Sequence, residues 1–294
     1  MKEQQSSIQF NKAESSKINF EIVTLKSLFE NQKKSSFDLQ KPHIAHKYSI
    51  LLITTGIGHH TIDFKKYDFT NGSILFTAKD QIQSFDFKPG NEGYIISFSE
   101  DFLSSTIERS HSLSQTWLYN YHIEQAKIQV KSVEQDHFFN IIERIFREYQ
   151  TKDEFAGKEI IQTLLNLFLL ESERKKRAEF FDPNKIDYSK LFFEYKNLCE
   201  KHYSVTRNVK HYAESLGISY KHLNNICKQS INKTAKQFID DFIILESKRN
   251  LLSSDKSVKE ISELTGFDEA TNFVKYFKKH TGFSPDKYRK KNLH

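Results

Sequence analysis

The pattern of apolar and polar residues differs between the two halves of the chain, and each pattern predicts a different kind of element. Over residues 20–99, short apolar runs are separated by turn-forming residues. Four runs show this pattern clearly: 48–54, 60–64, 73–77 and 94–98. The breaks contain Gly56, Gly58 and Asn71-Gly72, and an Asn-Gly pair is a strong signal for a two-residue β-hairpin turn. Strands of this length between such turns predict a small antiparallel barrel or sandwich.

Apolar residues return at helical spacing after Asp101, and they predict two amphipathic helices over 137–149 and 160–170. The first stripe consists of Phe138, Ile141, Ile142, Ile145 and Phe146, and the second of Ile160, Leu164, Leu165, Phe168 and Leu169. Such a pair could cover the open face of the barrel, or one stripe could contact a second subunit. The pattern does not decide between the two.

A polar stretch at 175–179, followed by Pro183, predicts a linker, because proline interrupts helical structure. The fold class is therefore α+β, with an N-terminal antiparallel β-barrel, flanking helices and an all-α C-terminal domain. We expect a flexible arm at 1–17, the barrel at 18–105, a helical segment at 106–180 that is a candidate for dimerisation, and the all-α domain at 187–294.

The all-α domain contains an internal repeat. Val209, Lys210, Glu214 and Gly217 recur 49 residues later as Val258, Lys259, Glu263 and Gly266. Beyond the glycine the offset is 50, so that Leu223, Cys227, Ala235 and Phe238 correspond to Phe273, Phe277, Pro285 and Tyr288. One residue inserted just after the second glycine accounts for the change.

Each copy has the pattern of a helix-turn-helix unit, the first at 208–229 and the second at 257–280. A short helix ends at a glycine, which adopts positive φ without steric cost. An apolar residue follows, and then an N-cap residue, Ser219 or Asp268, begins a second helix. A long helix predicted at 234–253 would separate the two second helices, so that they enter successive major grooves about 34 Å apart.

The face of each second helix opposite its apolar stripe is polar and basic, and this face would enter the major groove of DNA. Asparagine can form two hydrogen bonds with adenine, and lysine reaches guanine or phosphate. The candidate DNA-binding residues are Lys221, Asn224, Asn225 and Lys228 in the first unit and Thr271, Asn272, Lys275, Lys278 and Lys279 in the second. For any one of them taken singly, an ordinary solvated helix face is the alternative.

The charge distribution favours the DNA-binding interpretation. Residues 187–294 hold 20 Lys and Arg against 13 Asp and Glu, a net charge of +7, whereas the rest of the chain holds 24 against 25, a net charge of −1. The whole positive excess therefore lies in the C-terminal domain, as expected when a nucleic-acid-binding domain is joined to a neutral one.

Other features exclude other classes of protein. Residues 1–10 lack the pattern of a signal peptide, and the longest apolar run, 164–170, is too short to span a membrane, so we expect a soluble, cytoplasmic protein. The two cysteines, Cys199 and Cys227, are expected to be reduced and buried. No nucleophile elbow, P-loop, zinc-protease or dinucleotide-binding motif occurs, which argues against an enzyme.

Residues 258–267 and 272–289 carry a long and specific motif, with Phe273, Phe277-Lys278-Lys279, Gly282, Ser284-Pro285 and Tyr288-Arg289 at fixed spacing. In this motif the chain resembles the AraC/XylS family of bacterial transcription regulators, and 213–223 resembles the family's other helix-turn-helix unit. The resemblance implies base contacts from Lys221, Asn224 and Asn225 and from Thr271, Asn272 and Lys275. Four departures are Cys227 for the usual Phe, Asn232 for the usual Gly, and Ser247 and Ser262 for common Ala positions.

The N-terminal half resembles, more loosely, the cupin-like sensing domain of many such regulators, through residues 43–48, 56–64 and 97–102. His43, His46, His59 and His60 raise the alternative of a metal site. However, the adjacent His59 and His60 point to opposite faces of a strand, and the acid that follows is Asp63 rather than a glutamate. We therefore expect histidines at the surface or rim, with no metal and no cofactor.

We accordingly predict a sequence-specific transcription regulator that senses a signal in its N-terminal domain. Its expected partners are double-stranded promoter DNA, a possible small-molecule effector, a second copy in a homodimer and, if it activates, RNA polymerase; no membrane is involved. One alternative is a metal-dependent cupin enzyme with an accessory helical domain. A second alternative is a regulator controlled by a partner protein instead of a ligand.

Overall fold

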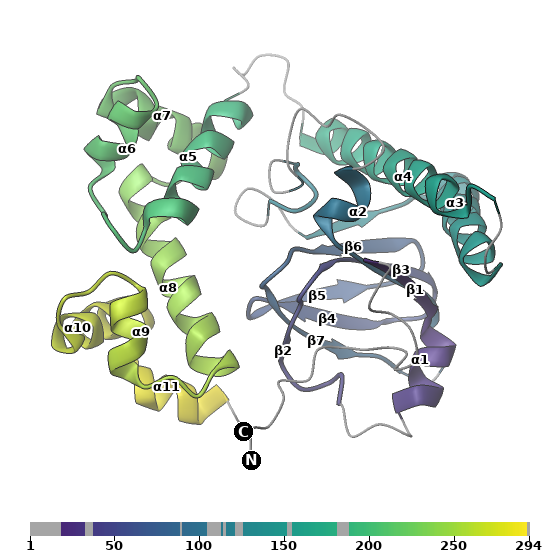
Figure 1. The fold of residues 1–294 in the computed structure, drawn as a ribbon, viewed down its shortest axis with the longest axis horizontal. Helices are drawn as coiled ribbons and strands as arrows, with labels where there is room; N and C mark the ends of the chain where they lie inside the picture. The colour runs from purple at the N-terminus through teal and green to yellow at the C-terminus, as the bar shows by residue number, and fades with distance from the viewer. Residues whose placement is uncertain are drawn as a thin grey trace. The chain divides into compact units, whose positions relative to one another are not determined.

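The computed structural model describes residues 19–32, 38–88, 90–104, 113, 116–120, 126–151, 155–180 and 188–292. The chain divides into two compact units, Met1–Asp182 and Pro183–His294 (Figure 1). The predicted fold class is confirmed, because the first unit is built on antiparallel sheets and the second is helical. The arm expected at 1–17 and the proline of the expected linker lie outside the described residues. Within the described ranges, no helix combines the length and apolar character needed to cross a membrane.

The first unit contains two antiparallel sheets. The five-stranded sheet has the order β1 (Phe20–Thr24), β8 (Glu92–Phe98), β3 (Tyr48–Thr55), β6 (Ser73–Thr77) and β9 (Lys127–Gln129). The four-stranded sheet has the order β2 (His43–Ile44), β7 (Ile82–Asp86), β4 (Gly58–Ile62) and β5 (Lys65–Phe69). Short helices α1 (Leu25–Gln32) and α2 (Glu100–Ser104) flank them. Strand β9 lies within the segment that the sequence predicts to be helical, so the sheet is completed by residues beyond 105.

The five-stranded sheet is the middle layer of the unit, and both of its faces are buried. On β3, Ile50 and Leu52 belong to one apolar core, whereas Leu51 and Ile53 belong to the core shared with the four-stranded sheet. A strand that is covered on both faces needs apolar residues at consecutive positions, which explains the unbroken run at 50–53.

Helices α3 (Ser132–Gln150) and α4 (Gly157–Phe180) cover the outer face of the five-stranded sheet (Figure 1). Ile142 and Ile145 of α3 and Leu165 and Phe168 of α4 are fully buried in this core. Both predicted stripes therefore pack inside the unit. The structure contradicts the linker predicted at 175–179, because α4 continues through it. Lys175 forms an ion pair with Glu134 of α3 at 2.7 Å, which gives this polar segment a partner within the unit.

The hairpin predicted at Asn71-Gly72 is wrong. Strand β5 pairs with β4 in one sheet, whereas β6 pairs with β3 and β9 in the other, so this turn carries the chain between sheets. The Asn-Gly pair indicates a tight reversal but does not specify which strands pair. A two-residue hairpin instead joins β4 to β5 through Asp63 and Phe64, which both have positive φ, 46° and 69°.

His60 lies inside the unit rather than at its surface, which corrects the expectation for this histidine. Its ring stacks on Phe85 with centroids 4.2 Å apart, and its Nε2 lies 3.1 Å from Oε1 of Gln83. Burial lowers the pKa of His60 to about 3. The neighbouring His59 points to the opposite face, as predicted, where it pairs with Asp86 at 3.2 Å. Among the described residues, no three His, Cys, Asp or Glu side chains stand close enough together to hold a metal ion.

The second unit consists of α5 (Ser189–His202), α6 (Val209–Ser215), α7 (Tyr220–Ile231), α8 (Ala235–Ser253), α9 (Val258–Leu264), α10 (Ala270–Thr281) and α11 (Pro285–Asn292). The repeat seen in the sequence is present in the structure, because α6 and α9 both have 7 residues and α7 and α10 both have 12. Helix α8 occupies the position predicted for the long helix, with Thr234 and Gln237 forming a capping box at its start.

We predict that acid destabilises the first unit through His60. Its pKa is about 3 when folded and about 6.5 when exposed, so the unfolded chain binds the proton more tightly. The stability contributed by neutral His60 is present above pH 6.5 and is lost as the pH falls from 6.5 toward 3. Urea unfolding can be followed through the fluorescence of Trp117, the single tryptophan, which lies in this unit.

The variant His60→Gln is expected to show a shallower loss of unfolding free energy over this pH range than the wild type. His46→Gln, at an exposed histidine of the same unit, is the control and should keep the wild-type slope. Equal pH slopes for His60→Gln and the wild type would show that burial of His60 does not cause the acid sensitivity.

Candidate nucleic-acid interface

Each short helix of the second unit ends in the same glycine turn. Gly217 has φ +66° and Gly266 has φ +75°, a region that favours glycine. The amide of the next residue donates back to a carbonyl five residues earlier, Ile218 to Ala213 at 3.0 Å and Phe267 to Ser262 at 2.9 Å. This is the hydrogen-bond pattern of a Schellman motif, and it turns the chain toward the second helix of each unit.

The second helices begin differently in the two copies. Ser219 caps α7 as predicted, and its hydroxyl accepts the amide N–H of His222 at 3.1 Å. In the second copy the N-cap of α10 is Glu269 and not Asp268, which corrects that expectation, and Glu269 makes no side-chain cap bond. The inserted residue that shifts the repeat offset therefore lies between Gly266 and Ala270, where the turn is one residue longer.

The apolar stripe of each second helix is fully buried. Leu223 and Cys227 of α7 and Phe273 and Phe277 of α10 have no solvent exposure. Burial raises the pKa of the Cys227 thiol to about 12, so this cysteine is a neutral apolar residue at the position where an aromatic ring is expected. Asn232 ends α7 with φ +54°, and Gly282 ends α10 with φ +78°. Asparagine tolerates this conformation, so the departure from glycine keeps the turn.

The opposite face of both helices is exposed. Three pairs of equivalent residues, 50 positions apart, point away from the buried stripe: Lys221 and Thr271, Asn225 and Lys275, and Lys228 and Lys278. Asn272 and Lys279, also predicted to contact DNA, are exposed beside them on α10. The hydroxyl of Thr271 donates to Oε2 of Glu269 at 3.2 Å. The structure therefore places eight of the nine predicted residues on exposed or polar helix faces and leaves them available to a ligand outside the unit.

Asn224, the remaining predicted residue, has a different environment. Its Oδ1 accepts the backbone N–H of Ala235, the first residue of α8, at 3.0 Å. Its Nδ2 donates to the carbonyl of Tyr220 at 3.1 Å. The Oδ1 atom thus joins α7 to the start of α8, whereas the Nδ2 bond lies within α7. Helical periodicity could not reveal this role, because the partner lies on another helix.

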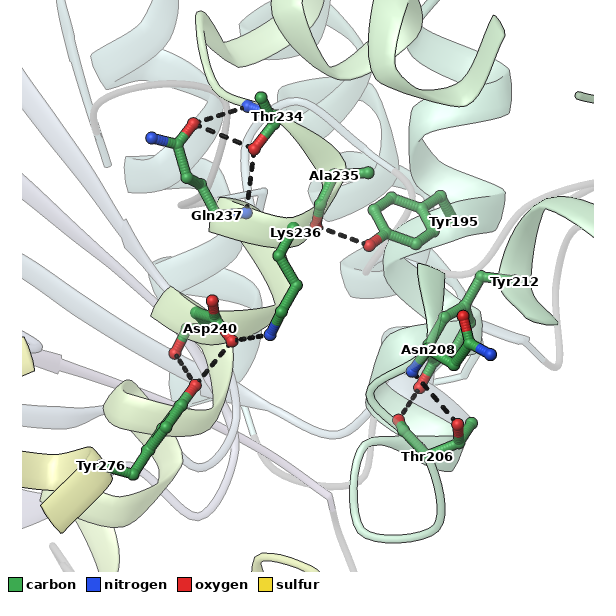
Figure 2. Close-up of polar contacts among 10 residues, drawn as sticks. All are labelled: Tyr195, Thr206, Asn208, Tyr212, Thr234, Ala235, Lys236, Gln237, Asp240 and Tyr276. Carbon is green, nitrogen blue, oxygen red and sulfur yellow. Dashed lines mark hydrogen bonds and ion pairs between the residues drawn. The ribbon is translucent and has the colours of Figure 1, made fainter. Parts of the chain in front are cut away.

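Sequence reasoning also missed the residues that hold the second helices against α8. The hydroxyl of Tyr276, on α10, donates to Oδ1 of Asp240 on α8 at 2.8 Å (Figure 2). Lys236, one turn earlier on α8, forms an ion pair with the same carboxylate. Burial raises the pKa of Tyr276 and keeps its hydroxyl protonated as a donor. On the other side of α8, Tyr195 of α5 donates to the carbonyl of Ala235 at 2.8 Å.

Two family models match the chain, one in each unit. Residues 212–291 match a helix-turn-helix domain, and residues 34–169 match the AraC-like ligand binding domain. The first match runs from within α6 to the last turn of α11. The second covers both sheets apart from β1, together with α3 and the first half of α4.

Relatives of known name are regulators. The chain is 25% identical over 261 residues to the Msm operon regulatory protein of Streptococcus mutans, a match that covers 85% of this chain and 86% of the relative. It is 20% identical over 164 residues to the raffinose operon transcriptional regulatory protein RafR of Pediococcus pentosaceus, covering 56% and 59%. Among solved structures, ToxT from Vibrio cholerae matches over 94% of this chain and 100% of its own, with 13% identity and a TM-score of 0.47.

Two helix-turn-helix units built on one long helix, together with a β-sheet ligand-binding domain, define a two-domain DNA-binding transcription regulator. The chain belongs to the AraC-type transcription regulators.

We predict that the adjacent residues Asn224 and Asn225 differ in their effect on stability. Asn224→Ala removes the acceptor of a helix N-terminal amide and is expected to lower the free energy of unfolding of the second unit by about 1 kcal/mol. Asn225→Ala, its matched control on the exposed face, is expected to leave the free energy of unfolding unchanged within about 0.5 kcal/mol. Chemical denaturation monitored by far-ultraviolet circular dichroism measures both, and equal losses would contradict the assignment.

Proposed function

We propose that α7 and α10 read DNA bases through the residues at their exposed equivalent positions. We call the short DNA sequence contacted by each helix a box. Lys221 and Asn225 contact bases in the first box, and Thr271, Asn272 and Lys275 contact bases in the second. Lys228, Lys278 and Lys279 bind backbone phosphates, because they lie late in their helices. The observation that carries this proposal is the coincidence of exposed polar residues at matching positions of two helices whose opposite faces are fully buried.

The geometry of α8 supports reading of a site with two boxes. With 19 residues at 1.5 Å each, α8 is about 28 Å long. Its first turn is joined to α7 through Asn224, and its far end leads into α9 and the second copy. A separation of this order is comparable with the roughly 34 Å between successive major grooves on one side of a duplex.

Base contacts and phosphate contacts predict different binding defects. The double variant Asn225→Ala/Lys275→Ala is expected to lose about 1–3 kcal/mol of operator affinity per removed contact, while its binding to random duplex changes little. Lys278→Ala is expected to weaken binding to every duplex and to lower the salt slope of log K by about 1. Fluorescence anisotropy with operator and random duplexes over a range of salt concentrations measures both effects.

Lys66→Ala, which removes an exposed lysine of the first unit, is the control for charge alone. Equal operator affinity for the wild type and Asn225→Ala/Lys275→Ala would refute the base-reading assignment. An unchanged salt slope for Lys278→Ala would refute the phosphate contact.

We infer that the first unit controls DNA binding by sensing a small molecule. The match to an AraC-like ligand binding domain supports this inference. Because one relative is named as the regulator of a raffinose operon, saccharides belong in the first panel of candidates. A thermal-shift screen of the whole chain against saccharides, other metabolites and lipids tests it. If no compound in the screen shifts the melting temperature, control by a partner protein is favoured.

We further propose that the regulator is a homodimer, not an enzyme, and that it acts on promoter DNA in the bacterial cytoplasm. When it activates, RNA polymerase is the remaining partner. The support for a dimer is on α4, where Leu167 and Leu170 are 43% and 58% exposed. These leucines, three residues apart, lie on the side of α4 that the predicted stripe does not use.

Leu167→Lys/Leu170→Lys is expected to convert the protein from dimer to a folded monomer, because neither leucine belongs to the core. Sedimentation velocity measures the change in mass. Val133→Lys, at a residue of α3 that is 89% exposed, is the control and should leave the dimer intact. A dimer that persists in the double variant would place the interface elsewhere.

A further inference from the structure

The connection between α5 and α6 contacts the second helix-turn-helix unit directly. Arg207, the residue before the N-cap of α6, places its guanidinium 3.6 Å from the centre of the Phe267 ring. The same guanidinium donates a hydrogen bond to the carbonyl of Gly266. It also lies 5.8 Å from the centre of the Tyr276 ring on α10. A residue just before the first helix-turn-helix copy is therefore bound to the turn of the second copy.

The backbone approach at the same place is unusually close. A Cβ atom added to Gly266 would lie 2.1 Å from the carbonyl oxygen and 2.8 Å from the Cα of Ser204, which are main-chain atoms. Gly217, at the equivalent turn of the first helix-turn-helix copy, would have no atom within 4 Å of an added Cβ. Both glycines have positive φ, but only at Gly266 does the close approach of another segment of the backbone, at Ser204, also leave no room for a Cβ atom. The segment from Ser204 to Arg207 thus rests on the turn between α9 and α10.

The contact is linked to the second helix of each helix-turn-helix copy, α7 and α10, which we call the recognition helices. Phe267 packs against Phe273 and Tyr276 of α10, with ring centroids 5.3 Å and 5.1 Å apart. On the other side, the hydroxyl of Tyr212 on α6 donates to the carbonyl of Thr206 at 2.8 Å (Figure 2). Helix α6 then packs on α7. A movement of one recognition helix relative to the other would have to break these contacts.

We propose that the contact of Arg207 and Ser204 with Gly266 and Phe267 is a second connection between the two recognition helices, in addition to α8. We call this contact the second tie. If only one helix joined the two helix-turn-helix copies, each copy could rotate about its contacts with that helix. Two connections fix both the distance between α7 and α10 and their relative rotation. Arg207 is accordingly a positioning residue that restricts the protein to operators with one spacing between the two boxes. This inference rests on the proposed function, in which both helices read one site.

The repeat provides matched controls for this proposal. At the offset of 49, the residue equivalent to Arg207 is Lys256, which is exposed. Lys256 has no corresponding turn to contact, since the described residues contain no third helix-turn-helix copy after α11. Lys256→Ala and Gly217→Ala therefore change the same positions of the repeat without touching the tie, whereas Arg207→Ala and Gly266→Ala disrupt it.

The experiment measures the affinity of the whole chain for a series of duplexes in which one or two base pairs are added or removed between the boxes. Each base pair moves one box by about 3.4 Å and rotates it by about 35°. The wild type, Lys256→Ala and Gly217→Ala are expected to lose at least about tenfold in affinity for every altered spacing. Arg207→Ala and Gly266→Ala are expected to bind the original spacing up to about tenfold more weakly, and to vary by less than about threefold across the series.

Arg207→Lys repeats the test with the charge retained and the planar stacking group removed, and it is expected to have the flat spacing profile of Arg207→Ala. Circular dichroism identifies any variant that does not fold, in which case Arg207→Lys carries the test. Spacing profiles of folded Arg207 variants that equal the wild-type profile would overturn the proposal. If the wild type binds no duplex above the level of random DNA, it is the proposed function that fails.

Discussion

The second unit depends on the burial of α8. Nine of its 19 residues are buried, including Phe238, Ile239, Phe242 and Ile243, because helices of both copies pack against it. Phe238 lies 5.2 Å from Phe192 of α5 between ring centroids. Helices as short as α6 and α9, with 7 residues each, are not stable alone in water. They persist because their apolar residues are buried against neighbouring helices, as α6 packs on α7 and α9 packs on α8 and α10.

The two copies of the repeat have helices of equal length and different surfaces, although the turn of the second copy is one residue longer. Both use a positive-φ glycine, a buried apolar stripe and a left-handed C-cap, so the exposed positions of α7 and α10 correspond one to one. At these positions Asn225 is matched by Lys275, and the last turn of α10 carries the further cation Lys279. Equal geometry with unequal chemistry is what a protein needs to read two different boxes in one orientation.

Local patterns predict the helices of both helix-turn-helix copies and the long helix between them, but not the bounds of α5 and α11. The repeat identified both turns, the long helix and the exposed positions, since these follow from helical periodicity and from the conformational freedom of Gly217 and Gly266. What they could not predict depends on contacts between elements. Asn224 lies on the polar side of α7 in sequence, yet its amide serves α8. Arg207 lies in a connection without any pattern, and only the folded chain brings it to Phe267.

The first unit has the same division between local and non-local information. Its strands and its helix pair follow from alternation and periodicity, whereas strand pairing does not. Asn71-Gly72 was therefore predicted as a hairpin although its flanking strands belong to different sheets, and His60 was expected at the surface although it stacks on Phe85 in the interior. The polar segment 175–179 reads as a linker because its ion-pair partner is on α3 and 41 residues away.

The central claim is that one chain reads two DNA boxes with two helices held at a fixed separation. Selection of binding sites by the purified protein from a pool of randomised duplexes tests it most directly. The account predicts enrichment of a site with two different boxes whose centres are about one helical turn, 10–10.5 base pairs, apart. Enrichment of a single box, of two boxes at variable spacing, or of no sequence at all would contradict it.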